Sequence, residues 1–324
     1  MFQKLIDKKD LKILFLIFSY QLVYAQDHLH SHGASVKPNS CNTRGLECAN
    51  AATPFITNDN QLWLVWTSGG AVSIAKSRDF GKTFEQEQVL VEHGKFLDTG
   101  GDARPQIIID QQGRIVIAYA FFKDSQWNAQ VNTMVSLDKG ISFSKPQSIV
   151  RDETSQRFPV MLLQDDNQIL ISWIDKRLAV QANKNGVKKL GGAIAYGWLD
   201  RNGKIIGKEL IANQDSCECC RIGLAQSKDR LPILVYRAIL NSTIRDHVVQ
   251  TISKTGSLGQ IYPVADDQWK TDSCPHHGPA ITVSQNASIH VAWYTQGSNR
   301  SGVFYANSSN NGQQFSSPKR LGNE

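Results

Sequence analysis

The feature that most constrains the fold is a motif that recurs five times along the chain. Each copy is a short apolar run, a polar turn such as "DQQGR", and a second apolar run that ends in an aromatic residue. The closing aromatics are Trp66, Tyr119, Trp173, Tyr236 and Trp293, at spacings of 53, 54, 63 and 57 residues. Short alternating runs separated by turn residues are typical of strands. A period of this length, with about four strands per unit, predicts an all-β propeller with five recognisable blades.

The same period divides the chain into blades. They are expected at about residues 50–90, 91–150, 151–213, 214–265 and 266–322, inside one β-propeller domain at residues 50–324. A His- and Cys-containing segment, residues 26–49, precedes this domain. Three alternatives remain open: this segment helps to close the ring, the fold is five-bladed, or it is an incomplete six-bladed ring.

Two turns between the third and fourth strands of a blade share a more specific pattern. Residues 77–84, "SRDFGKTF", and 136–143, "SLDKGISF", fit S-x-D-x-G-x-[TS]-F, and 308–315, "SSNNGQQF", is a degenerate copy. Asp79 and Asp138 are expected to accept backbone N–H bonds inside the turn, while the glycine supplies a positive φ and the phenylalanine anchors the hairpin. The pattern therefore predicts a structural turn.

These turns resemble the Asp-box (BNR-repeat) propellers of the sialidase superfamily, and the resemblance covers about residues 50–322. It implies a sialidase-like β-propeller. Catalytic members of that group hydrolyse terminal sialic acids, whereas other Asp-box proteins bind glycans or proteins without chemistry. The strings "CECCRI" and "CPHHGP" also resemble those of a little-characterised branch of exported bacterial Asp-box proteins, which implies no particular activity.

Residues 1–25 have the pattern of a signal peptide. A lysine-rich start precedes an apolar run at residues 13–18, and Val23 and Ala25 are the small residues before the expected cleavage point. The apolar run is too short to span a bilayer, so we expect no transmembrane segment after signal removal. The expected location is periplasmic or secreted, where the six cysteines of the chain can persist as disulfides.

The charge pattern limits the partners. The formal net charge of +6 falls to about +4 once residues 1–25, with four lysines and two aspartates, are removed. The charges are scattered without a Lys/Arg run, which argues against nucleic acid and favours a small anionic ligand or a glycan. We expect no nucleotide cofactor.

Blade topology gathers the unusual residues on one face. Alternate connections of a blade lie on opposite faces, so the loops that enter the first strands share a face with the second-to-third connections. Four entry loops there carry Arg, Cys or His: "GGDARP" (100–105), "SQRFP" (155–159), "CECCRIG" (217–223) and "CPHHGP" (274–279). We expect the functional site on this face.

Three arginines of these loops are candidate ligands for an anionic substrate: Arg104, Arg157 and Arg221. By resemblance, an exo-glycosidase of the sialidase type would also need a tyrosine nucleophile activated by a glutamate, and an aspartic acid/base. No such Tyr and Glu pair can be assigned, so the catalytic residues remain unknown. The structural alternative is that the arginines pair with Asp102, Asp175 or Asp246 and tie loops together.

The cysteines and histidines suggest a metal site. Thiolates and imidazoles suit copper or zinc, and the predicted ligands are Cys217, Cys219, Cys220, Cys274, His276, His277 and His247. The alternative is a set of disulfides that staple the loops of a non-catalytic glycan- or protein-binding propeller. Their short separation makes Cys41 and Cys48 a candidate local disulfide.

A second metal site is predicted at the mature N-terminus. Cleavage after Ala25 would make His28 the third residue, and a free amine, two backbone amides and an imidazole suit Cu(II) or Ni(II). His30 and His32 follow. The alternative is a polar leader without ligand.

Overall fold

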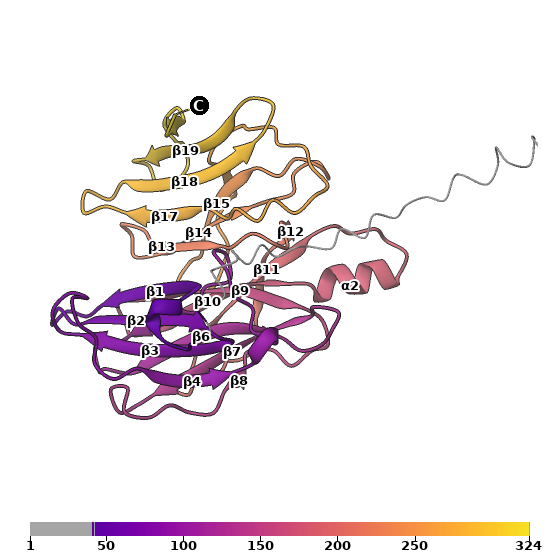
Figure 1. Cartoon of the computed structure of the whole chain (residues 1–324). Coiled ribbons are helices and arrows are strands. Elements are labelled where there is room, and N and C mark those ends of the chain that lie inside the picture. The colour runs from indigo at the N-terminus through magenta and orange to yellow at the C-terminus, as the bar shows by residue number, and fades with distance from the viewer. Residues whose placement is uncertain (1–40, 42, 324) are drawn as a thin grey trace, which may run out of the picture. The chain divides into compact units, whose positions relative to one another are not determined.

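The structure is a computed structural model that describes residue 41 and residues 43–323. The chain divides into the units Met1–Asn39 and Ser40–Glu324, and all described residues belong to the second. Five four-stranded antiparallel sheets make up this unit (Figure 1). Within each sheet the strands are neighbours in chain order, as expected for propeller blades. The all-β prediction and the five blades are confirmed.

The first sheet contains β1 (Ala51–Ile56), β2 (Leu62–Ser68), β3 (Ala71–Ser77) and β4 (Gln88–Glu92). The second contains β5 (Gln106–Ile109), β6 (Ile115–Phe122), β7 (Ala129–Ser136) and β8 (Gln147–Ser148). The third contains β9 (Gln156–Leu163), β10 (Ile169–Asp175), β11 (Gly192–Leu199) and β12 (Leu210–Ser216). The fourth contains β13 (Gly223–Gln226), β14 (Pro232–Arg237), β15 (His247–Thr251) and β16 (Tyr262–Pro263). The fifth contains β17 (Ala280–Val283), β18 (Ile289–Gln296), β19 (Ser301–Ser308) and β20 (Lys319–Leu321).

Three short helices lie among the described residues: η1 (Leu46–Cys48) before β1, η2 (Gly94–Phe96) between the first and second sheets, and α2 (Arg177–Lys184) within the third sheet. The helix α2 lies in the connection between β10 and β11. No described helix is long and apolar enough to cross a membrane.

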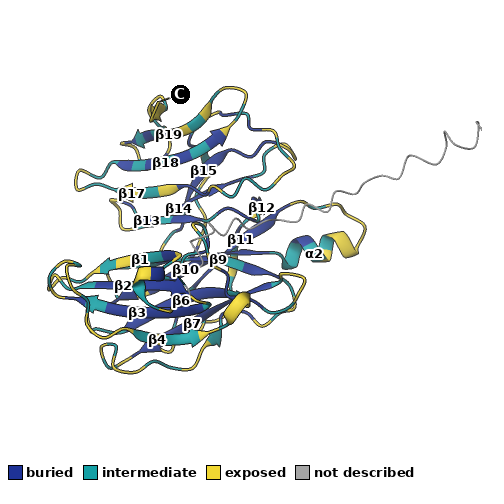
Figure 2. Cartoon of the chain, viewed as in Figure 1, coloured by how far each residue is buried: buried dark blue, intermediate teal, exposed yellow. Residues whose placement is uncertain are grey.

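Apolar clusters hold neighbouring blades together. Four clusters join the first blade to the second, the second to the third, the third to the fourth and the fourth to the fifth. Four of the five closing aromatics belong to these clusters: Tyr119, Trp173, Tyr236 and Trp293. Trp66 is also fully buried, although it belongs to none of them. The strand β6 belongs to the second blade, which packs between the first and the third. Almost all of its sequence IVIAYAFF is therefore buried (Figure 2).

The fifth blade differs because one of its faces is partly exposed. In β18, Ile289, Val291 and Trp293 are buried against the fourth blade, whereas the alternate side chains are partly buried or, at Gln296, exposed. Val303 of β19 is 42% exposed. Among residues 43–323, no apolar cluster joins the fifth blade to the first.

The repeated turns have the expected local geometry. Asp79 accepts hydrogen bonds from the Thr83 backbone N–H at 2.9 Å and the Thr83 hydroxyl at 2.6 Å. Asp138 accepts the equivalent pair from Ser142 at the same two distances. These bonds, those with the Thr83 and Ser142 hydroxyls first, lower the pKa of each aspartate to about 2.

The glycine of this turn also serves the contact between blades. Gly140 has a φ of 88°, and a Cβ there would lie 2.7 Å from the Trp63 ring of the preceding blade. Gly312 has a φ of 83° and lies against Val249 in the same way. A glycine is therefore required at this position for two reasons: the left-handed backbone conformation and the close approach of the preceding blade.

Candidate metal centre and anion pocket

The strand β12 delivers the "CECC" loop to the junction of the third and fourth blades. The Cys217 backbone N–H donates to the Arg237 carbonyl at 2.9 Å, and the Ser216 hydroxyl donates to the Gly192 carbonyl at 2.8 Å. Gly191 permits this approach, because a Cβ there would lie 2.1 Å from the Ser216 carbonyl oxygen. Cys217 is thus fixed by its own backbone bond to the fourth blade and by the bond of the neighbouring Ser216 hydroxyl within the third blade.

Four thiols come together at this point. Cys217, Cys219 and Cys220 are buried free cysteines, and Cys274 from the loop before β17 packs against them. The Cys217 and Cys219 sulfur atoms are 3.5 Å apart, well beyond the length of a disulfide bond of about 2.05 Å. The expected disulfide between Cys41 and Cys48 does form, with a Cα–Cα distance of 5.3 Å.

The ligand atoms form two overlapping sets. In the first set, Cys217, Cys219 and Cys220 place their sulfur atoms within 4.8 Å of one another. In the second set, Cys219, Cys274 and a ring nitrogen of His276 do the same. The structure therefore brings five of the seven predicted metal ligands together.

The three buried thiols differ in the direction of their pKa shifts. Hydrogen bonds with Cys219 and then Cys220 hold the pKa of Cys217 well below its ordinary value, and Arg237 contributes. Hydrogen bonds with Cys217, Cys220 and Cys274 raise the pKa of Cys219. Burial and the neighbouring Cys217 raise the pKa of Cys220. Among these three cysteines, ionisation is therefore favoured at Cys217 over Cys219 and Cys220.

Arg237, which was not among the predicted site residues, lies beside Cys217. It is 1% exposed and stacks on the Trp269 ring, with its guanidinium carbon 4.4 Å from the centroid. It donates to the backbone carbonyls of Arg245, His277 and Tyr294 at 2.9 to 3.0 Å. The signal in the sequence was a charged residue directly after the closing aromatic Tyr236, in an otherwise apolar strand.

Two predicted ligands lie outside the two sets. His247 is buried opposite Arg237 in the β14–β15 register, and neither ring nitrogen has a hydrogen-bond partner among the described residues. Burial, reinforced by Arg237, holds the pKa of His247 well below its ordinary value. The His277 ring lies 4.5 Å from the Tyr294 ring and its Nδ1 contacts the Pro275 carbonyl.

Arg157 borders the cluster but is already paired. Its Nε and Nη2 each donate to Asp98 at 2.8 Å, and its guanidinium also stacks on Phe122 and Phe158. Asp98, followed by the nearby Cys219 and Cys274, raises the pKa of Arg157 against the opposing effect of burial. Two of its nitrogen donors are therefore already committed to Asp98.

The other two arginines lie near the same carboxylate, that of Asp102. Arg221 Nη1 donates to Asp102 at 3.2 Å, and its Nε donates to the Pro279 carbonyl at 3.2 Å. Arg104 makes no ion pair with a described residue, and burial together with Arg221 lowers its pKa. Both line a cavity of about 190 Å³ beside Asp102. Two guanidinium groups facing one carboxylate leave this cavity suited to an anion.

The alternative role of the three arginines, ion pairs with Asp102, Asp175 or Asp246 that join loops, is found only in part. Asp102 pairs with Arg221 as that alternative expected. Asp175 pairs with Arg177, which is none of the three candidate arginines. Asp246 accepts three backbone N–H bonds, from residues 267, 268 and 269.

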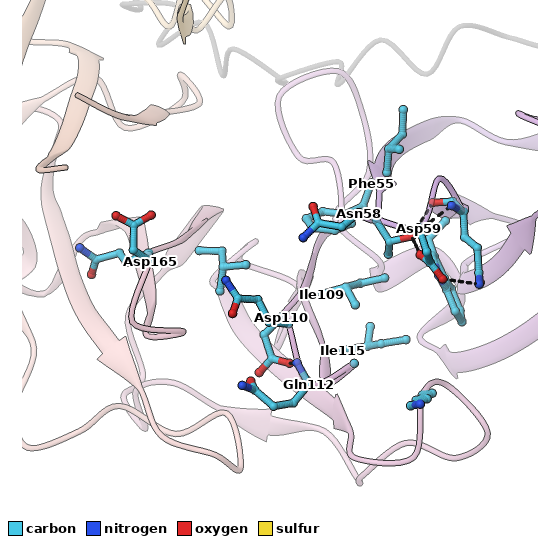
Figure 3. Close-up of a pocket in the computed structure, with 17 residues that line it drawn as sticks. Phe55, Asn58, Asp59, Ile109, Asp110, Gln112, Ile115 and Asp165 are labelled. Carbon is cyan, nitrogen blue, oxygen red and sulfur yellow. Dashed lines mark hydrogen bonds between the residues drawn. The ribbon is translucent and has the colours of Figure 1, made fainter. Parts of the chain in front are cut away.

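A larger cavity, of about 530 Å³, is lined by the turns between first and second strands of the first three blades (Figure 3). By blade topology this is the face opposite the cysteine loops. Asp59, Asp110 and Asp165 line it, but Asp59 and Asp110 bind groups of their own turns and Asp165 pairs with Arg230. No predicted site residue lines this cavity. His28, His30 and His32 lie outside the described residues.

Comparisons with solved structures support the fold. A Hadza microbial sialidase superposes with a TM-score of 0.53 at 14% identity, covering 86% of this chain and 60% of its own. The GH93 α-L-arabinofuranosidase of Fusarium graminearum, solved with arabinobiose, gives 0.54 and 14%, covering 88% of this chain and 83% of its own. A Penicillium chrysogenum α-L-arabinanase gives 0.52 and 13%, covering 84% and 81%.

The class of fold is therefore that of the sialidase-like β-propellers. The chain spans about 60% of the length of the sialidase, so that enzyme's activity does not carry over with the fold. No protein-family profile matches the sequence, and no curated protein matches it.

Proposed function

We propose that this protein is a metal-binding β-propeller that holds copper or zinc through its thiol cluster, beside an arginine-lined pocket for a small anion. The ligands are Cys217, Cys219, Cys220, Cys274 and His276. The observation that carries the proposal is the contact of four free thiols from two loops about 55 residues apart in sequence.

The spacing of the sulfur atoms supports a metal rather than disulfides. An ion with tetrahedral metal–sulfur bonds of about 2.3 Å keeps its sulfur ligands about 3.8 Å apart. The Cys217 and Cys219 sulfur atoms are 3.5 Å apart. Cys219 has three thiol neighbours, whereas a disulfide would use only one of them. Soft thiolate ligands select Cu(I) and Zn(II) among the common metals.

The positive surroundings support bound thiolates. Arg237 carries its charge into the buried layer beside Cys217, and no carboxylate among the described residues pairs with it. Arg157 contributes from the side of Cys219 and Cys274. Together with the ion, these guanidinium groups would offset the thiolate charge that burial otherwise disfavours.

Metal content measures this proposal directly. Protein purified without chelators is expected to contain Cu or Zn, and Cys219→Ser should lose it because this residue belongs to both ligand sets. The double variant Cys41→Ser/Cys48→Ser removes two sulfur atoms outside the cluster and should keep the metal. A metal-free protein whose four remaining cysteines show no free thiols would overturn the proposal in favour of disulfides.

A second candidate is hydrolysis of a glycoside that bears a carboxylate. Arg104 and Arg221 favour it, since they face the 190 Å³ cavity together. Five of the six described tyrosines bond through the hydroxyl to Asn, Gln or His side chains or to a carbonyl. The Tyr294 hydroxyl makes no hydrogen bond with a described residue, and none of the six bonds to a glutamate. Release of sialic acid from an aryl sialoside is the test; absence of turnover by folded protein on several linkages removes this candidate.

A further inference from the structure

The two ligand sets share one sulfur atom. Cys217 and Cys220 belong to the first set only, Cys274 and His276 to the second only, and Cys219 to both. A single tetrahedral ion takes four ligands that are all close to one another. The described ligand atoms instead form two groups of three, joined at Cys219.

We infer that the cluster holds two Cu(I) ions bridged by the Cys219 thiolate. This inference rests on the proposed metal-binding function and adds the number of ions, their kind and the role of each ligand. One ion would be bound by Cys217, Cys219 and Cys220, and the other by Cys219, Cys274 and His276.

The position of Cys219 suits a bridging ligand. Its sulfur lies 3.5 Å from the Cys217 sulfur and within 4.8 Å of the Cys220 and Cys274 sulfur atoms, so it is close to ligands of both sets. A thiolate sulfur has several lone pairs and can bind two soft ions at once. The side chain is buried, which keeps water from competing for either ion.

The number of ligands favours copper over zinc here. Structural zinc is almost always held by four protein ligands, whereas each set offers three. Cu(I) is soft, prefers thiolates and accepts three-coordinate sites. A second monovalent ion would also offset one more negative charge of a four-thiolate cluster, three of whose cysteines are buried, beside only two nearby arginines, Arg157 and Arg237.

The two ends of the cluster come from different loops. The first set lies within four consecutive residues of the loop between β12 and β13, so it needs no tertiary contact beyond that loop's own fold. The second set needs the loop before β17, which Arg237 anchors through the His277 carbonyl. Each ion can therefore be removed separately by changing one loop.

The experiment is anaerobic titration of the metal-free protein with Cu(I), followed by metal analysis. The native chain should bind two ions per chain, and X-ray absorption should show a short copper–copper vector. Cys217→Ser/Cys220→Ser and Cys274→Ser/His276→Ala should each bind one ion and lose that vector. Near-ultraviolet circular dichroism identifies any variant that fails to fold.

The outcomes separate this inference from the function on which it rests. One ion per native chain, with no copper–copper vector, would overturn the bridged pair and leave metal binding intact. No bound copper in the native chain would overturn both. Because these readings use the native chain, they remain decisive even if a variant misfolds.

Discussion

Arg237 Nη2 donates a hydrogen bond of 3.0 Å to the backbone carbonyl of His277, which joins the end of a strand in the fourth blade to the loop that carries Cys274 and His276. The same nitrogen donates to Tyr294 in the fifth blade at 2.9 Å. One buried guanidinium thus fixes the distance between the two halves of the thiol cluster. Its removal should affect both stability and metal binding.

Arg237→Ala should lower the free energy of unfolding by about 3 kcal/mol, because three carbonyls lose a charged donor in a buried site. Urea denaturation of the metal-free protein measures this loss. Arg230→Ala is the matched control, because Arg230 is an exposed member of a surface ion pair and should cost less than about 1 kcal/mol. Equal losses in the two variants would contradict the structural role of Arg237.

The two adjacent histidines should differ in their effect on metal binding. His276→Ala should weaken Cu(I) binding by about tenfold or more, since His276 belongs to the second ligand set. His277→Ala should change it much less, because that ring contacts Tyr294 and the Pro275 carbonyl. Competition with a Cu(I) chelator of known affinity compares them. A larger loss of Cu(I) affinity in His277→Ala than in His276→Ala would show that His277, and not His276, is the ligand.

Anion binding should depend on Arg104 and Arg221. Each charge-assisted contact contributes about 1.5 to 3 kcal/mol, so Arg104→Ala should weaken binding of N-acetylneuraminic acid by roughly 10- to 100-fold. Saturation-transfer NMR or calorimetry with this probe measures the change. Arg230→Ala again serves as the control, on the opposite face of the blades. Binding that is indifferent to both pocket arginines would place the anion elsewhere.

The repeated turns should make stability depend on pH in acid. Hydrogen bonds lower the folded-state pKa of Asp79 and Asp138 to about 2 from an ordinary value of 3.8. Since the folded pKa is depressed, their contribution is present above about pH 4 and is lost as the pH falls toward 2. Urea midpoints of Asp79→Asn/Asp138→Asn should therefore fall less steeply from pH 4 to pH 2 than those of the native chain. Parallel slopes would show that these carboxylates are not responsible.

Trp173 should be among the costliest residues to truncate. Its side chain is fully buried between the second and third blades, and its ring nitrogen donates to Asp175 at 3.0 Å. Trp173→Ala should lower the free energy of unfolding by about 3 to 5 kcal/mol. Ile141→Ala, at a side chain that is 81% exposed, should change it by less than about 0.5 kcal/mol. Comparable losses in both would contradict the packing described for this layer.

The parts of the fold that could be predicted depend on interactions between residues close in sequence. The turn at residues 77–84 completes its hydrogen bonds within itself, so Ser77, Asp79, Gly81 and Thr83 specify it wherever they occur together. The disulfide between Cys41 and Cys48 closes a seven-residue separation for the same reason. Strand alternation and the period of the closing aromatics likewise need no knowledge of long-range contacts.

The candidate site could be predicted only to the level of its loops. The sequence determined that the cysteines, the histidine pair and the arginines belong to loops on one face, because blade topology follows from the repeat. Only the tertiary structure decided that Cys274 and His276 meet Cys219 while His247 is buried beside Arg237. It also decided that Arg157 pairs with Asp98, whereas Arg104 has no ion-pair partner among the described residues. Those choices depend on where loops 50 to 120 residues apart come to lie and on which carboxylate each guanidinium reaches first. Such contacts leave no periodic trace in the chain, because each is made once, between segments that only the packing of the blades brings together.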